Sequence, residues 1–380
     1  MREAHLETLR SRLAALGRPH TAVDVAATLR DLGEVVTDAL VRETMSELRR
    51  HSVGAGPLDA LLAEPGVSDV LVNGPREVFV DRGSGLERAE VVFVDDEQVR
   101  RLAIRLAAAA GRRLDDSAPF VDGRLPDGTR LHAVLAPVAE PGTCLSLRVP
   151  ARRTFALDGL VAAGALPPAG AGVLRAVVAH RVPFLVSGGT GTGKSTLLSA
   201  LLALVPAEER IVLVEDAREL QPAHPHCVRL EGRPPNGEGA GAITLTTLVR
   251  QALRMRPDRV VLGEVRGGEL TDLLTALNTG HEGGCGTVHA NSISDIPARL
   301  EALAALGGLG RDACHAQVAA ALKAVIHVRR RHDGTRRVAG VGVFRRGPDG
   351  LVEVVPALSF GVDGVRREQA ADRLDELVSS

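Results

Sequence analysis

Aromatic residues are scarce in this sequence. It contains no tryptophan, no tyrosine and seven phenylalanines, which leaves few side chains on which nucleic-acid bases could stack. Its charges nearly cancel, with a formal net charge of −1 at pH 7, so no overall field draws the chain toward nucleic acid or anionic lipid. The composition therefore disfavours a protein whose main ligand is DNA or RNA.

Cysteines are few and scattered. The four of them form no CxxC pair and no metal-ligand spacing: Cys144, Cys227, Cys285 and Cys314. Such residues are typical of reduced, buried thiols in a cytosolic protein. The stretch from Met1 to His5 is too polar for a signal peptide, and no apolar run reaches the length of a membrane span. We therefore expect a cytoplasmic protein without an intrinsic membrane span, and its 380 residues suffice for two or three domains.

One glycine-rich stretch, GGTGTGKST, has the full spacing of a phosphate-binding P-loop. An apolar segment that predicts a buried strand, residues 183–187, precedes it, and an apolar segment that predicts a helix, residues 197–205, follows it. The nine candidate nucleotide-binding residues are Gly188, Gly189, Thr190, Gly191, Thr192, Gly193, Lys194, Ser195 and Thr196. Glycine-rich turns without a ligand do occur, but strand, loop, Lys-Ser pair and helix all stand here in the expected order.

Each residue type in the motif suits the binding of ATP and Mg²⁺. Glycines let main-chain N–H groups line an anion site at the helix N-terminus. Lys194 would reach the β- and γ-phosphates, and the Ser195 hydroxyl would be a ligand of Mg²⁺. Only Lys194 and Lys323 are lysines among the 46 basic residues. A chain that otherwise uses arginine thus keeps a compact ammonium at the position where a planar guanidinium does not substitute for it.

Three further motifs place acids and histidines after predicted strands or in loops. RIVLVED, residues 210–216, ends in Glu215 and Asp216, and RVVLGEVRGGE, residues 259–269, contains Glu264. Acids at the carboxyl ends of strands beside a P-loop lie where Mg²⁺ and an attacking water would sit. Either Glu264 or Glu215 could be the general base. NTGHEGGCGTVHAN, residues 278–291, adds His281 and His289, which on their own could equally be structural.

The chain divides into four predicted parts of mixed α/β character: a helical segment over 1–53, an α/β domain over 54–150, a linker over 151–160 and a larger α/β domain over 161–380. The first part shows helical spacing of Leu6, Leu9, Leu13 and Leu16, and then of Val25, Leu29 and Leu32. The second predicts strands over 67–72, 77–81, 86–94 and within 122–150, with a helix capped by Asp95.

The C-terminal third predicts helices over 298–306 and 312–325, then a hairpin that turns at Asp333-Gly334, and a polar helix over 366–378. Five arginines flank the hairpin turn: Arg329, Arg330, Arg331, Arg336 and Arg337. They could contact DNA or lipid head groups, but a single short basic stretch favours a solvated hairpin.

The order of these motifs resembles that of the type II/IV secretion ATPase superfamily, most closely its tight-adherence (Tad, CpaF-like) pilus branch, which includes actinobacterial members associated with conjugal transfer. The resemblance covers residues 55–345. It rests on PLDALLAEPGVSDVLVNGP, VDGRLPDGTR, GGTGTGKST, EDARELQ, HCVRLEGRPPN, ALRMRPDRVVLGEVRGGE and NTGHEGGCGTVHAN.

This resemblance implies a RecA-like ATPase domain preceded by a smaller sensor-like α/β domain, in a hexamer that works at the cytoplasmic membrane. It implies that Glu264 is the catalytic glutamate of an atypical Walker B motif. It further implies that Glu215 and Asp216 form an Asp box. His289 would belong to a His box, with His281 in the preceding TGH element. It also implies that Arg124, Arg130 and Arg148 contact nucleotide phosphates. The tetracysteine element of some relatives is absent, so we expect no zinc.

We therefore expect a hexameric ATPase motor that drives Tad-like pilus assembly or type II/IV secretion together with platform proteins of the inner membrane. Two alternatives stay open: a DNA-translocating ATPase of conjugation, and a nucleotide-gated scaffold or septum-site regulator with little turnover. The near-neutral charge and the few aromatic residues weigh against the first, and we expect no tight binding of duplex DNA.

Overall fold

The computed structural model describes residues 12, 21–34, 36–38, 40–41, 44, 54–83, 85–150, 155–233, 235, 240–331, 333–361 and 364–379. The chain divides into two compact units, Met1–Pro150 and Ala151–Ser380. None of the helices formed by the described residues combines the length and the apolar character needed to cross a bilayer.

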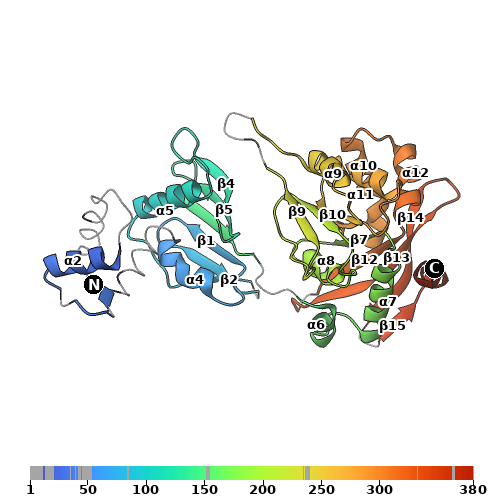
Figure 1. Ribbon diagram of the computed structural model, residues 1–380, viewed down its shortest axis with the longest axis horizontal. Coiled ribbons are helices and arrows are strands. Elements are labelled where there is room, and N and C mark those ends of the chain that lie inside the picture. The colour runs from blue at the N-terminus through green and yellow to red at the C-terminus, as the bar shows by residue number, and fades with distance from the viewer. Residues whose placement is uncertain are drawn as a thin grey trace. The chain divides into compact units, whose positions relative to one another are not determined.

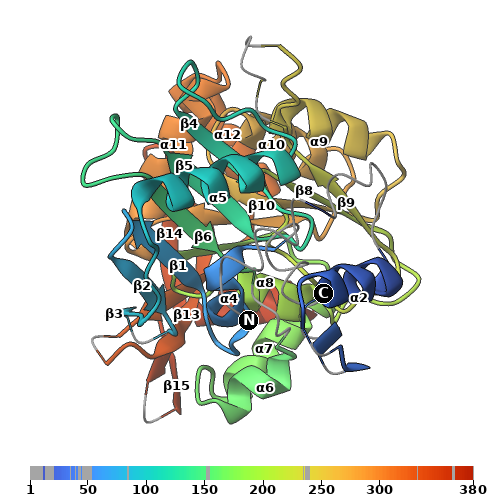
Figure 2. The same cartoon turned by 90° about the vertical axis from the view of Figure 1, so that its left-hand side faces the viewer.

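The first unit is an antiparallel sheet covered on one face by a helix. Over the described residues the sheet has six strands in the order β3-β2-β1-β6-β5-β4. Figure 2 shows helix α5 lying across this sheet. The elements of this unit are α2 (Ala22–Asp31), η1 (Gly56–Leu58), α4 (Asp59–Ala63), β1 (Asp69–Asn73), β2 (Val78–Asp81), β3 (Leu86–Arg88), α5 (Asp96–Ala109), β4 (Phe120–Arg124), β5 (Arg130–Val134) and β6 (Cys144–Arg148).

The alternation of buried and exposed residues explains the strands of this unit, and an N-cap residue explains where helix α5 begins. Along β1 and β5, every second residue is buried, as expected for strands with one face on a core. Helix α5 buries Val99, Leu102 and Leu106 against that core, and Asp95 caps it by accepting a hydrogen bond from the N–H of Gln98 over 2.8 Å. The predicted cap and helix are thus confirmed.

The expected helical segment over 1–53 is described only in part. Helix α2 begins after Thr21 and buries Val25 and Leu29, as their spacing predicted. Of the helix expected from Leu6 to Leu16, only Arg12 is among the described residues.

The second unit is a doubly wound domain, in which a mostly parallel sheet lies between two groups of helices. Over the described residues the order is β15-β14-β13-β12-β7-β11-β10-β8-β9. Pairs from β12 to β9 are parallel, and pairs from β12 to β15 are antiparallel. The strands are β7 (Phe184–Gly188), β8 (Ile211–Glu215), β9 (Cys227–Glu231), β10 (Arg259–Val265), β11 (Cys285–His289), β12 (Ala324–Arg330), β13 (Arg336–Arg346), β14 (Val352–Gly361) and β15 (Gly364–Arg367).

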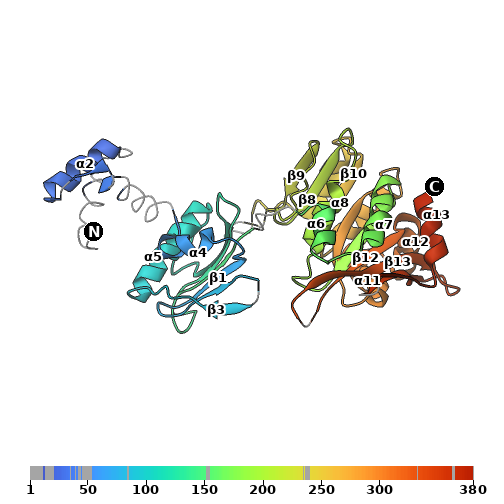
Figure 3. The ribbon, with the colours of Figure 1, turned by 90° about the horizontal axis from the view of Figure 1, so that it is seen from below.

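The helices pack on both faces of this sheet (Figure 1). One core lies beneath α6 (Leu157–Ala162), α7 (Pro168–Ala179), α8 (Lys194–Leu202) and α13 (Ala371–Ser379), of which the first three stand together in Figure 3. The other lies beneath α9 (Leu245–Leu253), α10 (Glu269–Leu277), α11 (Ile296–Leu306) and α12 (Arg311–Ala321), with η2 (Ile293–Asp295) beside it. Because both faces are covered, every residue of β7 and β8 is buried, and the two strands are apolar up to Val186 and Val214.

Contacts with other parts of the domain shift two predicted boundaries, the end of the linker and the end of one helix. The linker was expected to reach residue 160, but α6 begins at Leu157, whose side chain is buried in the core of the second unit. The helix expected over 312–325 ends at Ala321, because Lys323 and Ala324 donate main-chain hydrogen bonds to Pro183 and start the pairing of β12 with β7.

Two other predicted elements are shorter than expected. The strand predicted over 86–94 ends at Arg88, because its partner β2 begins at Val78 and the ladder closes there. The helix predicted over 366–378 begins at Ala371, since Arg366 and Arg367 pair with β14 as part of β15.

Candidate active site

The P-loop joins the buried strand β7 to helix α8, as predicted. Gly191 has a φ of +67° and Gly193, the N-cap of α8, a φ of +95°, which glycine adopts without the steric cost borne by other residues. A Cβ at Gly188 would lie 2.5 Å from the carbonyl oxygen of Val328. Gly188, Gly191 and Gly193 are therefore required by the turn itself.

Lys194 is folded back over its own loop. Its Nζ donates to the carbonyl oxygens of Gly188 over 3.0 Å and Gly189 over 2.9 Å. The residue is buried, with 9% of its surface exposed, and burial lowers the pKa of its ammonium while the Glu264 carboxylate opposes that shift. These contacts hold a cation where phosphate oxygens would be its stronger partners.

His289 lies beside Lys194 because β11 pairs with β7 in a register that sets His289 opposite Gly188. Its Nε2 is 3.0 Å from Thr190 Oγ1, and its Nδ1 is 3.5 Å from Lys194 Nζ. Partial burial, and then the Lys194 charge, lower the pKa of His289. The imidazole can therefore relay a change at the phosphate site between the loop and β11.

His281 lies elsewhere. It precedes β11, whose carboxyl end carries His289, and its ring contacts the carbonyl oxygen of Ala276 at the end of α10 over 3.3 Å. These contacts favour the structural interpretation of His281.

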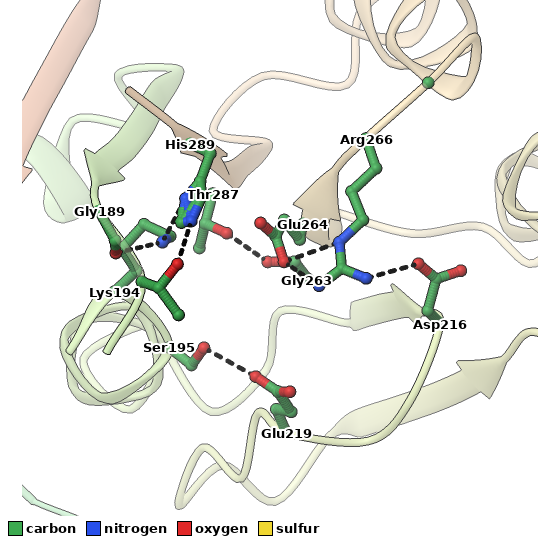
Figure 4. Close-up of polar contacts among 12 residues, drawn as sticks. Gly189, Lys194, Ser195, Asp216, Glu219, Gly263, Glu264, Arg266, Thr287 and His289 are labelled. Carbon is green, nitrogen blue, oxygen red and sulfur yellow. Dashed lines mark hydrogen bonds and ion pairs between the residues drawn. The ribbon is translucent and has the colours of Figure 1, made fainter. Parts of the chain in front are cut away.

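Glu264 stands near the carboxyl end of β10 and is held by an arginine that the sequence interpretation missed. Its Oε2 accepts from Arg266 Nε over 2.9 Å and from Nη2 over 2.5 Å (Figure 4). Arg266 Nη1 also lies 3.7 Å from the Asp216 carboxylate. Arg266 therefore links the acids of two neighbouring strands at this edge of the sheet.

Of the three acids in the EDARELQ motif, the sequence interpretation singled out Glu215 and Asp216, but the structure gives Glu219 the contact with the P-loop. Glu215 is buried, with 2% of its surface exposed, and its Oε1 accepts the main-chain N–H groups of Glu219 and Leu220, each over 2.8 Å. The acid that reaches the P-loop is Glu219, whose Oε2 accepts from Ser195 Oγ over 3.2 Å (Figure 4). Glu215 thus supports the loop that carries Glu219, in contrast with the expected place near the metal.

The packing of Glu215 explains the glycine before Glu264. A Cβ at Gly263 would lie 2.6 Å from Glu215 Cγ, so any larger residue would push the buried carboxylate aside. Burial raises the pKa of Glu215, although its two main-chain donors and Arg229 act in the opposite direction. Thr287 Oγ1 donates to the Gly263 carbonyl over 2.7 Å and ties β11 to the same point of β10.

The donor set fits Mg²⁺. A hydroxyl and a carboxylate, from Ser195 and Glu219, meet at the start of α8. Magnesium is commonly held by one or two carboxylates with substrate phosphates and waters. Over the described residues no cluster of three or more His, Cys, Asp or Glu side chains could hold a metal ion, so Mg²⁺ bound here would depend on the phosphates for its remaining ligands.

The three arginines implied by the resemblance lie in the first unit, in one row across neighbouring strands. Arg124 of β4 pairs with Arg130 of β5, which pairs in turn with Arg148 of β6. Arg148 then faces Asp69 of β1, whose carboxylate lies 3.1 Å from its Nε. Directly paired residues project from the same face of a sheet. The row is on the face opposite Leu131 and Leu147, which enter the core beneath α5.

The doubly wound sheet, the P-loop on its central strand and the acids and histidine at its carboxyl edge define the second unit as a RecA-like P-loop domain. Residues 51–342 match the Type II/IV secretion system protein family. The chain belongs to this family of secretion ATPases.

Similar proteins agree with this assignment. The chain is 55% identical over 324 residues to the Mycobacterium tuberculosis H37Rv protein named "Putative conjugal transfer protein Rv3659c", with 84% of this chain and 92% of that protein covered. It is 33% identical over 334 residues to the type IV secretion system protein VirB11 of Brucella suis, with 79% and 92% covered. The crystal structure of the pilus retraction motor PilT with bound ADP shares the fold at a TM-score of 0.53 and 19% identity, with 84% of this chain and 87% of that one covered.

Proposed function

We propose that this chain is a Mg²⁺-dependent ATPase that works as a ring-shaped motor of a secretion or pilus machine at the cytoplasmic face of a membrane.

 Lys194 and the P-loop would hold the phosphates, Ser195 and Glu219 the metal ion, and Glu264 would orient or deprotonate the attacking water. Two contacts at the P-loop support this proposal. The Ser195 hydroxyl donates to Glu219, and on the other side of the loop His289 lies beside the Lys194 ammonium.

Hexamer formation and the pilus role are parts of the same proposal. Membership of the secretion ATPase family supports a motor that acts with membrane platform proteins. A ring would let nucleotide-driven changes in one subunit pass to the next. The Tad-like pilus role rests on the motifs of residues 55–345 and is tested by co-purification with inner-membrane proteins of a pilus system.

The direct test is steady-state ATP hydrolysis by the full chain, with and without membranes. Lys194→Ala should abolish hydrolysis, because it removes the cation that compensates phosphate charge. Lys323→Ala is the matched control: it removes the one other lysine of the sequence, whose Nζ donates to carbonyl oxygens of α12 over 2.6 and 3.2 Å. Hydrolysis by Lys194→Ala at the wild-type rate would refute the P-loop assignment. Binding of ATP with negligible turnover in wild type would instead favour the scaffold alternative.

A second candidate, DNA translocation in conjugation, is favoured by the name of the Mycobacterium tuberculosis relative. It predicts DNA binding that weakens steeply with salt. We expect weak binding of duplex DNA at physiological salt, since the β12–β13 hairpin offers at most about five phosphate contacts. Submicromolar affinity that is lost on Arg329→Ala, Arg330→Ala and Arg331→Ala together would favour translocation of DNA.

A further inference from the structure

The main chain at Arg266 is held in place by a buried acid at the start of α10. The acid is Glu269, whose Oε1 accepts the N–H groups of Arg266 over 2.6 Å and of Gly267 over 2.8 Å. A Cβ at Gly267 would lie 3.1 Å from the other carboxylate oxygen of Glu269. The turn from β10 to α10 is therefore tightly packed, and it determines which groups the Arg266 side chain can reach.

The Arg266 guanidinium lies between two carboxylates from neighbouring strands (Figure 4). Its Nε and Nη2 both donate to Glu264 Oε2, and its Nη1 lies 3.7 Å from Asp216 Oδ2. Parallel pairing of β10 with β8 brings both acids to the same edge of the sheet. An arginine fork can hold two groups in a fixed relative position, which the ammonium of a lysine does less well. Asp216, Arg266 and Glu264 therefore form a row of alternating charge along this edge.

Glu264 is held through only one of its two carboxylate oxygens. Both arginine donors take Oε2, and within the described part of the chain no hydrogen bond reaches Oε1. Burial lowers the pKa of the Lys194 ammonium and the Glu264 carboxylate opposes that shift, so the two side chains lie near each other. A general base requires this kind of geometry, because it must be fixed in direction and still offer an oxygen to the proton that it accepts.

We propose that Arg266 is a positioning residue for ATP hydrolysis: it holds Glu264 by Oε2 so that Oε1 faces the attacking water, and Asp216 in turn orients the Arg266 fork. The inference rests on the proposed ATPase function. It gives Asp216 a role that passes through Arg266, whereas the sequence pattern placed this acid near Mg²⁺. The side chains of Arg266 and Asp216 are each about half exposed, and ion pairs so exposed contribute little to stability. The chemistry of the site therefore explains their arrangement better than folding does.

Steady-state kinetics of the full chain with Mg·ATP test this role. Arg266→Ala should lower kcat by about 10²-fold, the cost of a small misplacement of a reacting group, and should leave KM close to wild type, because the P-loop contacts remain. Arg266→Lys keeps the charge without the fork, so its kcat should lie between the two. Arg250→Ala is the matched control, since it removes an arginine that donates to Asp272 of the same helix α10 over 2.8 Å. A higher kcat in Arg266→Ala would overturn the proposal, because Arg266 would then restrain Glu264.

Two double variants show whether the effect passes through Glu264. When Glu264→Gln is already present, Arg266→Ala should cause no further loss of single-turnover rate, because the base that it positions is gone. When Arg266→Ala is present, Asp216→Asn should likewise cause no further loss. A full additional loss in either double variant would overturn the proposal, since Arg266 or Asp216 would then act on the nucleotide, metal or water directly. Wild-type kcat in Arg266→Ala would refute the positioning role alone. Absence of hydrolysis by the wild type would refute the ATPase function.

Discussion

The buried Oε1 of Glu215 accepts the main-chain N–H of Glu219 over 2.8 Å, so the first acid of the EDARELQ motif holds the last in place. Glu215 also accepts the N–H of Leu220, and its Oε2 lies 3.6 Å from Arg229 Nη2 on the edge strand β9. Glu219 in turn meets the P-loop at Ser195. A chain of contacts thus runs from the edge strand β9 to Ser195 of the P-loop.

This arrangement predicts different effects for the two acids. Glu219→Gln should raise the Mg²⁺ concentration needed for half-maximal hydrolysis, because an amide is a poorer magnesium ligand, and should leave the melting temperature unchanged. Glu215→Ala should lower both activity and melting temperature, since each main-chain N–H left without its acceptor costs about 1–3 kcal/mol. Hydrolysis rates across a Mg²⁺ series and thermal melts separate the two. An unchanged Mg²⁺ requirement in Glu219→Gln would argue against a metal role.

The sequence was enough to locate the site, but not to tell which acidic residue contacts the P-loop. Glycine spacing and strand patterns identified Gly188 to Thr196, and the strand-end rule brought Glu264 to the same edge as Lys194. His289 was expected in a glycine-rich loop and was singled out by the family resemblance, whereas the structure places it at the end of β11 beside Lys194. Whether Glu215 or Glu219 faces the P-loop depends on which carboxylate the main chain captures after β8, and a linear pattern does not encode that choice. Likewise, the pairing of β12 with β7 overrode the helical pattern at Lys323.

Glu264→Gln should bind Mg·ATP with nearly wild-type affinity but hydrolyse it about 10²–10⁴-fold more slowly, because the amide keeps the shape of the side chain and cannot accept a proton. Glu353→Gln is a matched control, since Glu353 also pairs with an arginine, Arg345, on neighbouring strands. Single-turnover hydrolysis and nucleotide affinity are to be measured together. Loss of ATP binding by Glu264→Gln would make this residue structural.

The buried imidazole of His327 is expected to make the stability of the folded chain depend on pH. It is 5% exposed, its Nδ1 lies 2.9 Å from Ser187 Oγ, and burial, followed by Arg329, lowers its pKa. The folded chain therefore binds this proton less readily than the unfolded chain, so stability should fall as the pH drops below about 6.5 and level off below the pKa of the folded state. His289 shifts in the same direction.

The variant His327→Asn should be less stable than wild type at neutral pH but lose less stability on acidification. Thermal melts at matched pH values give both quantities. An identical loss on acidification in the variant and in wild type would show that other groups control the acid sensitivity.

The row Arg124, Arg130 and Arg148 places three guanidinium groups side by side on neighbouring strands of the first unit. Asp69 forms an ion pair with Arg148 at the end of the row. Guanidinium groups suit phosphate oxygens, so the row is suited to an anionic ligand.

We therefore expect each of Arg124→Ala, Arg130→Ala and Arg148→Ala to slow ATP turnover far more than it weakens ATP binding. An arginine that stabilises the transferring phosphoryl group contributes about 10³–10⁵ in rate. Arg88→Ala on β3 is the control within the same sheet. A chain that begins at residue 155 should bind ATP and hydrolyse it poorly, since it keeps the P-loop and loses the row. Full turnover by that shortened chain, or wild-type turnover in all three arginine variants, would leave the row without a part in hydrolysis.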